Sequence, residues 1–224
     1  GLFVMARNGA SSVSFAVPTG NFGDVLAGYY AWRMGLPISR LVLATNENDI
    51  LARFFNTGTY ELGKVVKTLS PSMDIQVASN FERYLYDRVG RDSAVLKDLL
   101  RGFQETGRLT VPAEAGPREE VFAAGVGDTE QTLETIRRYQ ADYDYLLDPH
   151  TAVGVSVGEG FIREGEPMVC LATAHPAKFN EAITRAVGEP ARHEILDALA
   201  EAETRCDTVP CDVEALKAYI AAHV

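Results

Sequence analysis

Residues 17–24 read VPTGNFGD, and this short stretch is the most informative of the chain. It joins an apolar strand pattern over residues 13–17 to an apolar helix pattern over residues 25–34. A glycine-bearing turn between a strand and a helix leaves backbone N–H groups free at the positive end of the helix dipole. The turn therefore predicts a binding site for a phosphate group.

The turn matches neither of two standard nucleotide-binding motifs. The dinucleotide fingerprint requires three glycines at fixed positions, and a Walker loop requires a lysine followed by serine or threonine after its second glycine. A Gly-x-x-Gly sequence is also compatible with an ordinary strand-to-helix turn in which Asn21 or Asp24 caps the helix. From the spacing alone, a phosphate site and an ordinary turn both remain open.

The surrounding pattern alternates strands and helices. Further buried strands are predicted at residues 41–44, 121–126 and 167–171. The helix over residues 24–34 is apolar nearly all round, so we expect it to be buried on every side. Strand–helix–strand units of this kind indicate an α/β fold: an open, mostly parallel sheet with helices on both faces.

The organisation along the chain predicts one domain. A helical, charged pattern covers residues 80–107, and a further strand is expected at residues 75–78. We expect a single α/β domain over residues 1–224, with a helical insertion near residues 80–120 and amphipathic helices at the C-terminal end.

Composition narrows the function classes. The 224 residues carry a formal net charge of −10, which disfavours nucleic acid and anionic membrane as partners. No apolar run approaches the roughly 20 residues of a membrane span. The three cysteines have no framework spacing, and Cys206 and Cys211 lack a second Cys/His pair. We therefore expect no metal site and a reducing, cytoplasmic compartment.

A second strand-to-helix turn is expected at the same edge of the sheet as residues 17–24. Residues 173–179 follow the strand predicted at 167–171, and they combine small and polar side chains before a helix. Ligands of open parallel sheets bind beyond the carboxyl ends of the strands. If both strands lie near the sheet centre, this turn and the turn at residues 17–24 face one crevice.

Several polar residues first predict local structural roles. Asp128 and Gln131 have the spacing of a capping box, and Asn46, Asn48 and Asp49 are interpreted as helix caps.

Two histidines receive structural interpretations as well. His150 is interpreted as a turn histidine that bonds backbone carbonyls, and His175 as a residue that orders the turn around Thr173. A metal site that combines Asp148 with these histidines matches no standard ligand spacing.

Four segments together resemble threonine synthase. They occur in the family's order and roughly at its spacing, and the resemblance runs from about residue 13 to the C-terminus. The segments are VPTGNFGD (17–24), ATNEND (44–49), DPHTA (148–152) and ATAHPAKF (172–179).

The resemblance implies a pyridoxal 5′-phosphate enzyme of the tryptophan-synthase-β fold type. Such an enzyme converts O-phosphohomoserine and water to threonine and phosphate. By this resemblance, Thr173 faces the pyridine nitrogen, and Asp24 orders the loop or caps the helix rather than touching phosphate. The loop residues that match the family's loop around the cofactor phosphate are Gly20, Asn21, Phe22, Gly23 and Asp24.

The resemblance also implies that the lysine that forms the Schiff base with the cofactor is absent from these 224 residues. The chain has five lysines, and none matches the family's Schiff-base motif, which lies upstream of the phosphate loop. The sequence starts with Gly1 rather than methionine. We therefore expect the C-terminal portion of a threonine synthase, inactive by itself, with the N-terminal half of the same enzyme as its partner.

Two other functions remain open at this point. The chain could be a non-catalytic homologue or fragment that binds a phosphorylated ligand. It could also be an unrelated doubly wound domain whose loop holds a nucleotide phosphate. A comparison of pyridoxal 5′-phosphate binding with nucleotide binding distinguishes this nucleotide-binding domain from the other two functions.

Overall fold

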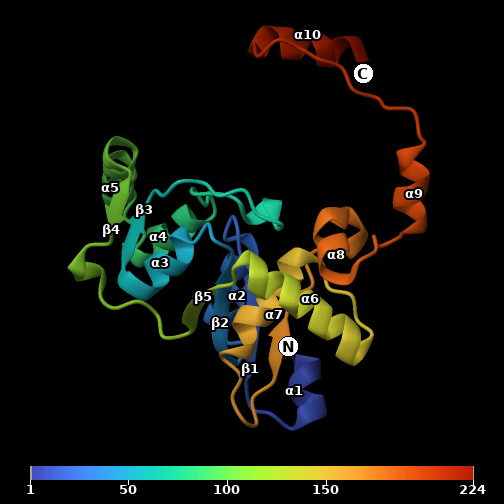
Figure 1. Ribbon diagram of the computed structural model, residues 1–224. Coiled ribbons are helices and arrows are strands. Elements are labelled where there is room, and N and C mark those ends of the chain that lie inside the picture. Colours follow the sequence, from blue (N-terminus) through green and yellow to red (C-terminus); the bar gives the residue numbers. More distant parts are fainter. Residues whose placement is uncertain (1, 224) are drawn as a thin grey trace. The chain divides into compact units, whose positions relative to one another are not determined.

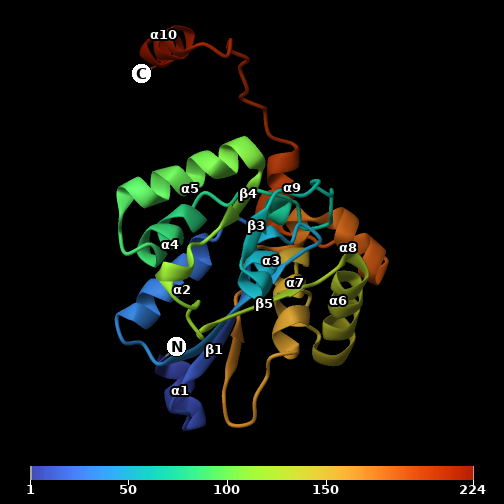
Figure 2. The same cartoon turned by 90° about the vertical axis from the view of Figure 1, so that its left-hand side faces the viewer.

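The computed structural model describes residues 2–223 (Figure 1 and Figure 2). Contacts within the chain divide it into two compact units, one ending at Ala191 and the other beginning at Arg192, and each is described by itself. The expected single domain over the whole chain stays a prediction. Among the described residues, no helix combines the length and the apolar character needed to cross a bilayer.

The first unit is built on a parallel sheet of four strands. In spatial order these are β5 (Phe122–Val126), β2 (Ile38–Thr45), β1 (Val13–Pro18) and β6 (Met168–Cys170). All pairings in this sheet are parallel, which confirms the predicted open parallel sheet. Parallel neighbours end at the same edge, so the segments that follow β1 and β6 leave the sheet side by side.

Aromatic side chains pack the helices on one face of this sheet. These helices are α2 (Gly23–Arg33), α3 (Ile50–Thr57) and α4 (Phe81–Arg88). The ring of Phe22 stacks on Phe55 with ring centroids 5.7 Å apart and meets Phe81 edge-on at 5.6 Å. Val17 and Leu43 of the strands complete this cluster. Large rings thus fill the layer between the sheet and the helices.

Small residues pack the opposite face. The helices there are α6 (Thr129–Tyr143), α7 (Pro149–Glu159) and α8 (Asn180–Val187). A Cβ added at Gly158 would lie 2.7 Å from the Cβ of Ala16, and one at Gly154 would lie 2.9 Å from Cγ of Pro18. The two glycines therefore permit α7 to pack closely on β1. Figure 2 shows α2 and α4 on one side of the sheet and α6 and α7 on the other.

The other elements are shorter or lie away from the sheet. In the first unit they are α1 (Leu2–Asn8), β3 (Thr59–Glu61), α5 (Ser93–Thr106), β4 (Arg108–Thr110) and the 3-10 turns η1 (Pro71–Met73), η2 (Ala113–Ala115) and η3 (Pro176–Lys178). The second unit contains α9 (Glu194–Ala200) and α10 (Val213–His223). Helices α4 and α5 account for the helical pattern predicted over residues 80–107.

The strand predicted at residues 75–78 is wrong. The chain there is irregular, and the backbone N–H of Ala78 donates to the Tyr60 hydroxyl at 2.9 Å instead of to a neighbouring strand. The small antiparallel sheet of this region instead pairs β3 with β4. Alternation of apolar residues over so few positions does not distinguish a strand from a loop that packs on the core.

Helix α2 is also less buried than its composition predicts. Val25, Leu26 and Tyr29 are buried, but Tyr30 is 38% exposed. Met34, which follows the helix, is 86% exposed. The prediction of burial on every side is wrong because no further layer of described residues covers the outer face of this helix.

Candidate functional site

The turn after β1 holds an unusual backbone conformation. Phe22 immediately precedes α2 with a φ of 64°, in the left-handed region that few residues other than glycine adopt. Its ring is 1% exposed and lies in the aromatic cluster on that face of the sheet. Burial of the ring thus offsets the backbone strain and fixes the direction in which the turn enters the helix.

This turn presents unpaired donors to a cavity. Within residues 2–223, the backbone N–H groups from Gly20 to Val25 donate no hydrogen bond, and no side chain caps α2. A cavity of about 230 Å³ lies over the turn and is lined by residues 17–25. Consecutive N–H groups at the positive end of a helix dipole suit an anion of the size of a phosphate monoester.

Gly20 and Asn21 fix the turn against the segment that contains η1. A Cβ at Gly20 would lie 2.6 Å from the backbone oxygen of Ser72, so only glycine fits there. The Asn21 Oδ1 accepts hydrogen bonds from the Ser79 N–H at 2.5 Å and from the Ser79 hydroxyl at 3.0 Å. The side-chain oxygen of Asn21 therefore orders the loop.

Asp24 does not cap the helix. The residue before α2 is Phe22, and Asp24 lies exposed in the first turn with no hydrogen bond to another described residue. The interpretation of Asp24 as a cap is therefore wrong. Its carboxylate lies near the positive end of the dipole, where a negative charge stabilises the helix.

The interpretation of Asn46 and Asn48 as helix caps is also wrong. Asn46 Nδ2 donates to Thr68 Oγ1 and to Asp74 Oδ1, both at 2.8 Å. Asn48 Nδ2 donates to Asp74 Oδ1 at 3.0 Å, and Asn48 Oδ1 accepts from the Val66 N–H at 2.9 Å. Both side chains are buried, and they join the end of β2 to the segment that leads into η1.

Asp49 does precede α3, but its side chain makes no cap hydrogen bond. The carboxylate instead pairs with Arg53 at 2.8 Å, one helical turn along. The backbone position was predicted correctly, whereas the role of the side chain was not.

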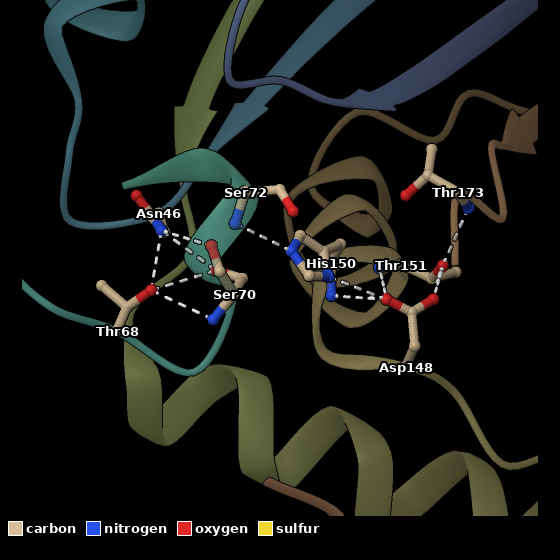
Figure 3. Close-up of polar contacts among 8 residues, drawn as sticks. All are labelled: Asn46, Thr68, Ser70, Ser72, Asp148, His150, Thr151 and Thr173. Carbon is tan, nitrogen blue, oxygen red and sulfur yellow. Dashed lines mark hydrogen bonds and ion pairs between the residues drawn. The ribbon is translucent and has the colours of Figure 1, made fainter. Parts of the chain in front are cut away.

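A chain of hydrogen bonds connects η1 with the start of α7 (Figure 3). The Ser72 N–H donates to His150 Nε2 at 3.3 Å, and His150 Nδ1 lies 3.1 Å from Asp148 Oδ1. Thr151 Oγ1 donates to Asp148 Oδ2. The Thr173 N–H donates to Thr151 Oγ1 at 3.3 Å. These bonds link the segment beside the phosphate turn to the turn after β6.

His150 differs from its sequence interpretation in its partners. It accepts a bond from a backbone N–H and faces a carboxylate, whereas bonds to backbone carbonyls were expected. It is 4% exposed and packs against the ring of Phe179, with centroids 4.6 Å apart. His175 caps η3 by accepting from the Ala177 N–H at 3.2 Å, which agrees with its expected role in that turn.

Asp148 is the charged centre of this network. Burial alone raises the pKa of its carboxyl group, but hydrogen bonds from the side chains and backbone N–H groups of His150 and Thr151 outweigh it. The pKa of Asp148 is therefore lowered, and the carboxylate stays ionised although it is only 2% exposed.

Thr173 lies in the turn beside the phosphate turn. Ala16 of β1 pairs with Cys170 of β6, so the segments that contain Thr19 and Thr173 follow the two strands at the same level. Thr173 is exposed and is not among the residues that line the 230 Å³ cavity. The structure thus groups the five predicted loop residues in one cavity and places Thr173 next to them, in a separate turn.

Sequence reasoning missed Ser72 and the network around Asp148. Both segments carry a proline at the first position of a helix, at Pro71 and Pro149, flanked by short polar side chains. That signature predicts a helix start, but it does not reveal that two such starts bond to each other. No lysine lines the cavity over the turn, and residues 2–223 contain no cluster of His, Cys, Asp and Glu that could hold a metal ion.

Comparisons with known proteins identify the family. A family model described as "Threonine synthase, C-terminal" matches residues 151–220. Threonine synthase of Pseudomonas aeruginosa is 44% identical over 216 residues, which cover 95% of this chain and 46% of that protein. Threonine synthase of Saccharomyces cerevisiae is 44% identical over 207 residues, covering 83% of this chain and 40% of that protein.

Solved structures agree with these sequence matches. A pyridoxal-phosphate-bound threonine synthase from Brucella melitensis superposes with a TM-score of 0.85 and 41% identity, over 99% of this chain and 49% of that one. Threonine synthase from yeast superposes with a TM-score of 0.83 and 36% identity. The chain spans about half the length of the curated relatives it matches. Over the segment that it covers, the chain belongs to the threonine synthase family.

Proposed function

We propose that this chain supplies the cofactor-phosphate site of a threonine synthase, which converts O-phosphohomoserine and water to threonine and phosphate. The observation that carries the proposal is the run of unpaired backbone N–H groups from Gly20 to Val25 over one cavity. The reaction is inferred from the similarity to threonine synthases. The role of this chain in binding the cofactor phosphate is inferred from the turn.

The donor set of the turn fits the phosphate of pyridoxal 5′-phosphate. The main-chain N–H groups of residues 20–25 would hold the phosphate oxygens, and Asn21 Nδ2 adds a side-chain donor within the same turn. Because Gly20 lies against Ser72, the turn has little freedom to collapse when the ligand leaves. Such a site is preorganised for its anion.

Thr173 would face the ring of the cofactor from the neighbouring turn. Its hydroxyl would meet the pyridine nitrogen, which a hydroxyl does not keep protonated as a carboxylate would. When bound, the cofactor acts as an electron sink for cleavage at the carbon atoms of an amino acid. The chain's own contribution is to bind the phosphate, orient the ring and leave its nitrogen uncharged.

In this family a lysine attaches the cofactor, but no lysine of this chain lines the cavity over the turn. We propose that the N-terminal half of the same enzyme supplies that lysine and completes the substrate site. The isolated chain would then bind the cofactor phosphate without turning over substrate. A cytoplasmic location is part of the same proposal.

A titration tests the binding part of the proposal. Pyridoxal 5′-phosphate is added to the ¹⁵N-labelled chain, and the backbone amide shifts of residues 20–25 are followed. We expect saturable changes there with pyridoxal 5′-phosphate and with inorganic phosphate, and none with pyridoxal, which lacks the phosphate. Equal responses to pyridoxal and its phosphate would contradict the site.

Gly20→Ala provides the variant for this titration. The added methyl group would lie 2.6 Å from the backbone oxygen of Ser72, so we expect loss of phosphate binding. Gly102→Ala is the matched control, because a Cβ at Gly102 meets no atom within 4 Å. Threonine formation from O-phosphohomoserine is then measured with the chain alone and with the complementary half of the Pseudomonas aeruginosa relative. Phosphate binding without activity in the mixture would favour a non-catalytic binder.

A further inference from the structure

The phosphate turn and the Thr173 turn share one support. The first rests on Ser72 through the close approach of Gly20, and the second rests on Thr151 through the Thr173 N–H. Ser72 and Thr151 are in turn joined through His150 and Asp148, at the start of α7 (Figure 3). The two sides of the proposed cofactor site therefore meet in a single network, whose central residues Asp148, His150 and Thr151 are buried.

The partners of His150 determine which of its ring nitrogens carries hydrogen. The Ser72 backbone N–H can only donate, so Nε2 must present its lone pair. The hydrogen of a neutral imidazole then lies on Nδ1, where it is donated to Asp148 Oδ1. The ring is held in this orientation by Phe179 and by burial.

We infer that His150 is a positioning residue for the phosphate turn and acts through Ser72. This inference rests on the proposed function of that turn. The acceptor at Nε2 fixes the backbone of Ser72, and the backbone oxygen of the same residue limits where Gly20 lies. Without that acceptor, the η1 segment loses its bond to α7, and the N–H groups of the turn lose their fixed spacing. His150 itself does not line the cavity over the turn.

Two substitutions separate the acceptor from the bulk of the side chain. His150→Gln keeps an oxygen that can accept the Ser72 N–H near the position of Nε2, whereas His150→Leu keeps volume without an acceptor. The probe is sulfate, a tetrahedral dianion that does not titrate near neutral pH, and the readout is the backbone amide shifts of residues 20–25. His223→Leu, at an exposed histidine of the second unit, is the matched control.

We expect His150→Leu to weaken sulfate binding about tenfold, which corresponds to about 1.4 kcal/mol, near the upper end of the contribution of one hydrogen bond. His150→Gln should remain within about threefold of the unsubstituted chain, and His223→Leu should leave binding unchanged. The Thr173 amide should also shift in His150→Leu, because it belongs to the same network. Equal sulfate affinity in the Leu variant and the unsubstituted chain would overturn the inference and leave the proposed function intact.

A measurement on the unsubstituted chain keeps the inference testable if the Leu variant does not fold. The ¹⁵N shifts of the His150 ring report which nitrogen carries hydrogen, and we expect the Nδ1–H form. Hydrogen on Nε2 would overturn the inference, because that nitrogen could not accept from Ser72. Absence of any sulfate or phosphate response in the unsubstituted chain would instead overturn the proposed function, and the inference with it.

Discussion

Helices α2 and α7 both begin at the carboxyl edge of the sheet, on opposite faces, but their first turns are satisfied differently. Asp148 caps α7, and its carboxylate accepts from the N–H groups of His150 and Thr151. Helix α2 follows Phe22, which has no polar side chain, and its first N–H groups have no acceptor among the described residues. The first N–H groups of α7 are satisfied by the Asp148 carboxylate, and those of α2 have no acceptor among the described residues.

The two helices also differ in how they pack. Rings such as Phe22 and Tyr29 pack beside α2, and Gly28 of α2 lies against the Leu41 side chain of β2. Gly154 and Gly158 bring α7 close to Pro18 and Ala16 of β1. Helix α6 covers the outer side of α7, so α7 is buried nearly throughout. The comparison of α2 with α7 shows that a helix start at the carboxyl edge of the sheet does not by itself leave N–H groups free. The residue before the helix decides whether its N–H groups remain available.

The largest expected effect comes from the residue that opens α2. Phe22→Ala removes a ring that is 1% exposed from the centre of the aromatic cluster, so we expect a loss of about 3–5 kcal/mol in the free energy of unfolding. Urea denaturation measures it. Met34→Ala is the control, since Met34 is 86% exposed and its truncation should leave the midpoint nearly unchanged. Similar losses in both variants would contradict the role given to the ring.

The next largest loss of stability is expected from removing the charge of Asp148, which caps α7. Asp148→Asn removes the charge that accepts four hydrogen bonds, and we expect a loss of about 1.5–3 kcal/mol in the free energy of unfolding. The pKa of Asp148 is lowered in the folded chain, so its stabilisation is present above the unfolded pKa of about 4 and is lost as pH falls below it. Denaturation at several pH values should show a shallower acid dependence in the variant. An unchanged pH dependence would show that Asp148 titrates alike in both states.

Close packing of α7 on β1 is tested at Gly158. Gly158→Ala would place a methyl group 2.7 Å from the Cβ of Ala16, and we expect a loss of about 1–3 kcal/mol. Gly102→Ala in α5 meets no neighbour, so it should stabilise by roughly 0.5–1 kcal/mol through helix propensity. Thermal unfolding compares the two. If Gly158→Ala were as stable as Gly102→Ala, α7 would not lie as close to the sheet as its glycines indicate.

The smallest effect concerns α6, which covers α7. Asp128 and Gln131 form a capping box, with the Gln131 N–H donating to Asp128 Oδ1 at 2.8 Å. We expect Asp128→Ala to cost about 1 kcal/mol in the free energy of unfolding, as measured by urea denaturation. Phosphate binding at the α2 turn should not change, because this cap lies on another helix. A loss of phosphate binding would mean that the two helix starts are coupled more widely than the comparison assumes.

Local patterns predicted the elements that local chemistry controls. The capping box of Asp128 and Gln131 was predicted correctly, because it depends on residues within one helical turn. The parallel sheet also followed from the alternation of strands and helices. The turn at residues 17–24 could be proposed as a phosphate site from the sequence because its glycines and its strand-to-helix position are contiguous.

Some of the errors have their physical origin in contacts between residues distant in the sequence. Asn46 and Asn48 have the residue types of helix caps, but their side chains bond to Thr68 and Asp74 across a loop. Composition could not show that the outer face of α2 has no covering layer in the described residues.

The alternation of strands and helices, and the strand-to-helix turn at residues 17–24, could be predicted from the amino-acid sequence, since these depend on neighbours along the chain. The three-dimensional packing was needed to show that the Ser72 N–H donates to His150 and that the Thr173 turn is supported by the same network. Those residues lie tens of positions apart in the chain. Their contact depends on the order of the strands and on the close approach of α7 to the sheet, which no local pattern encodes.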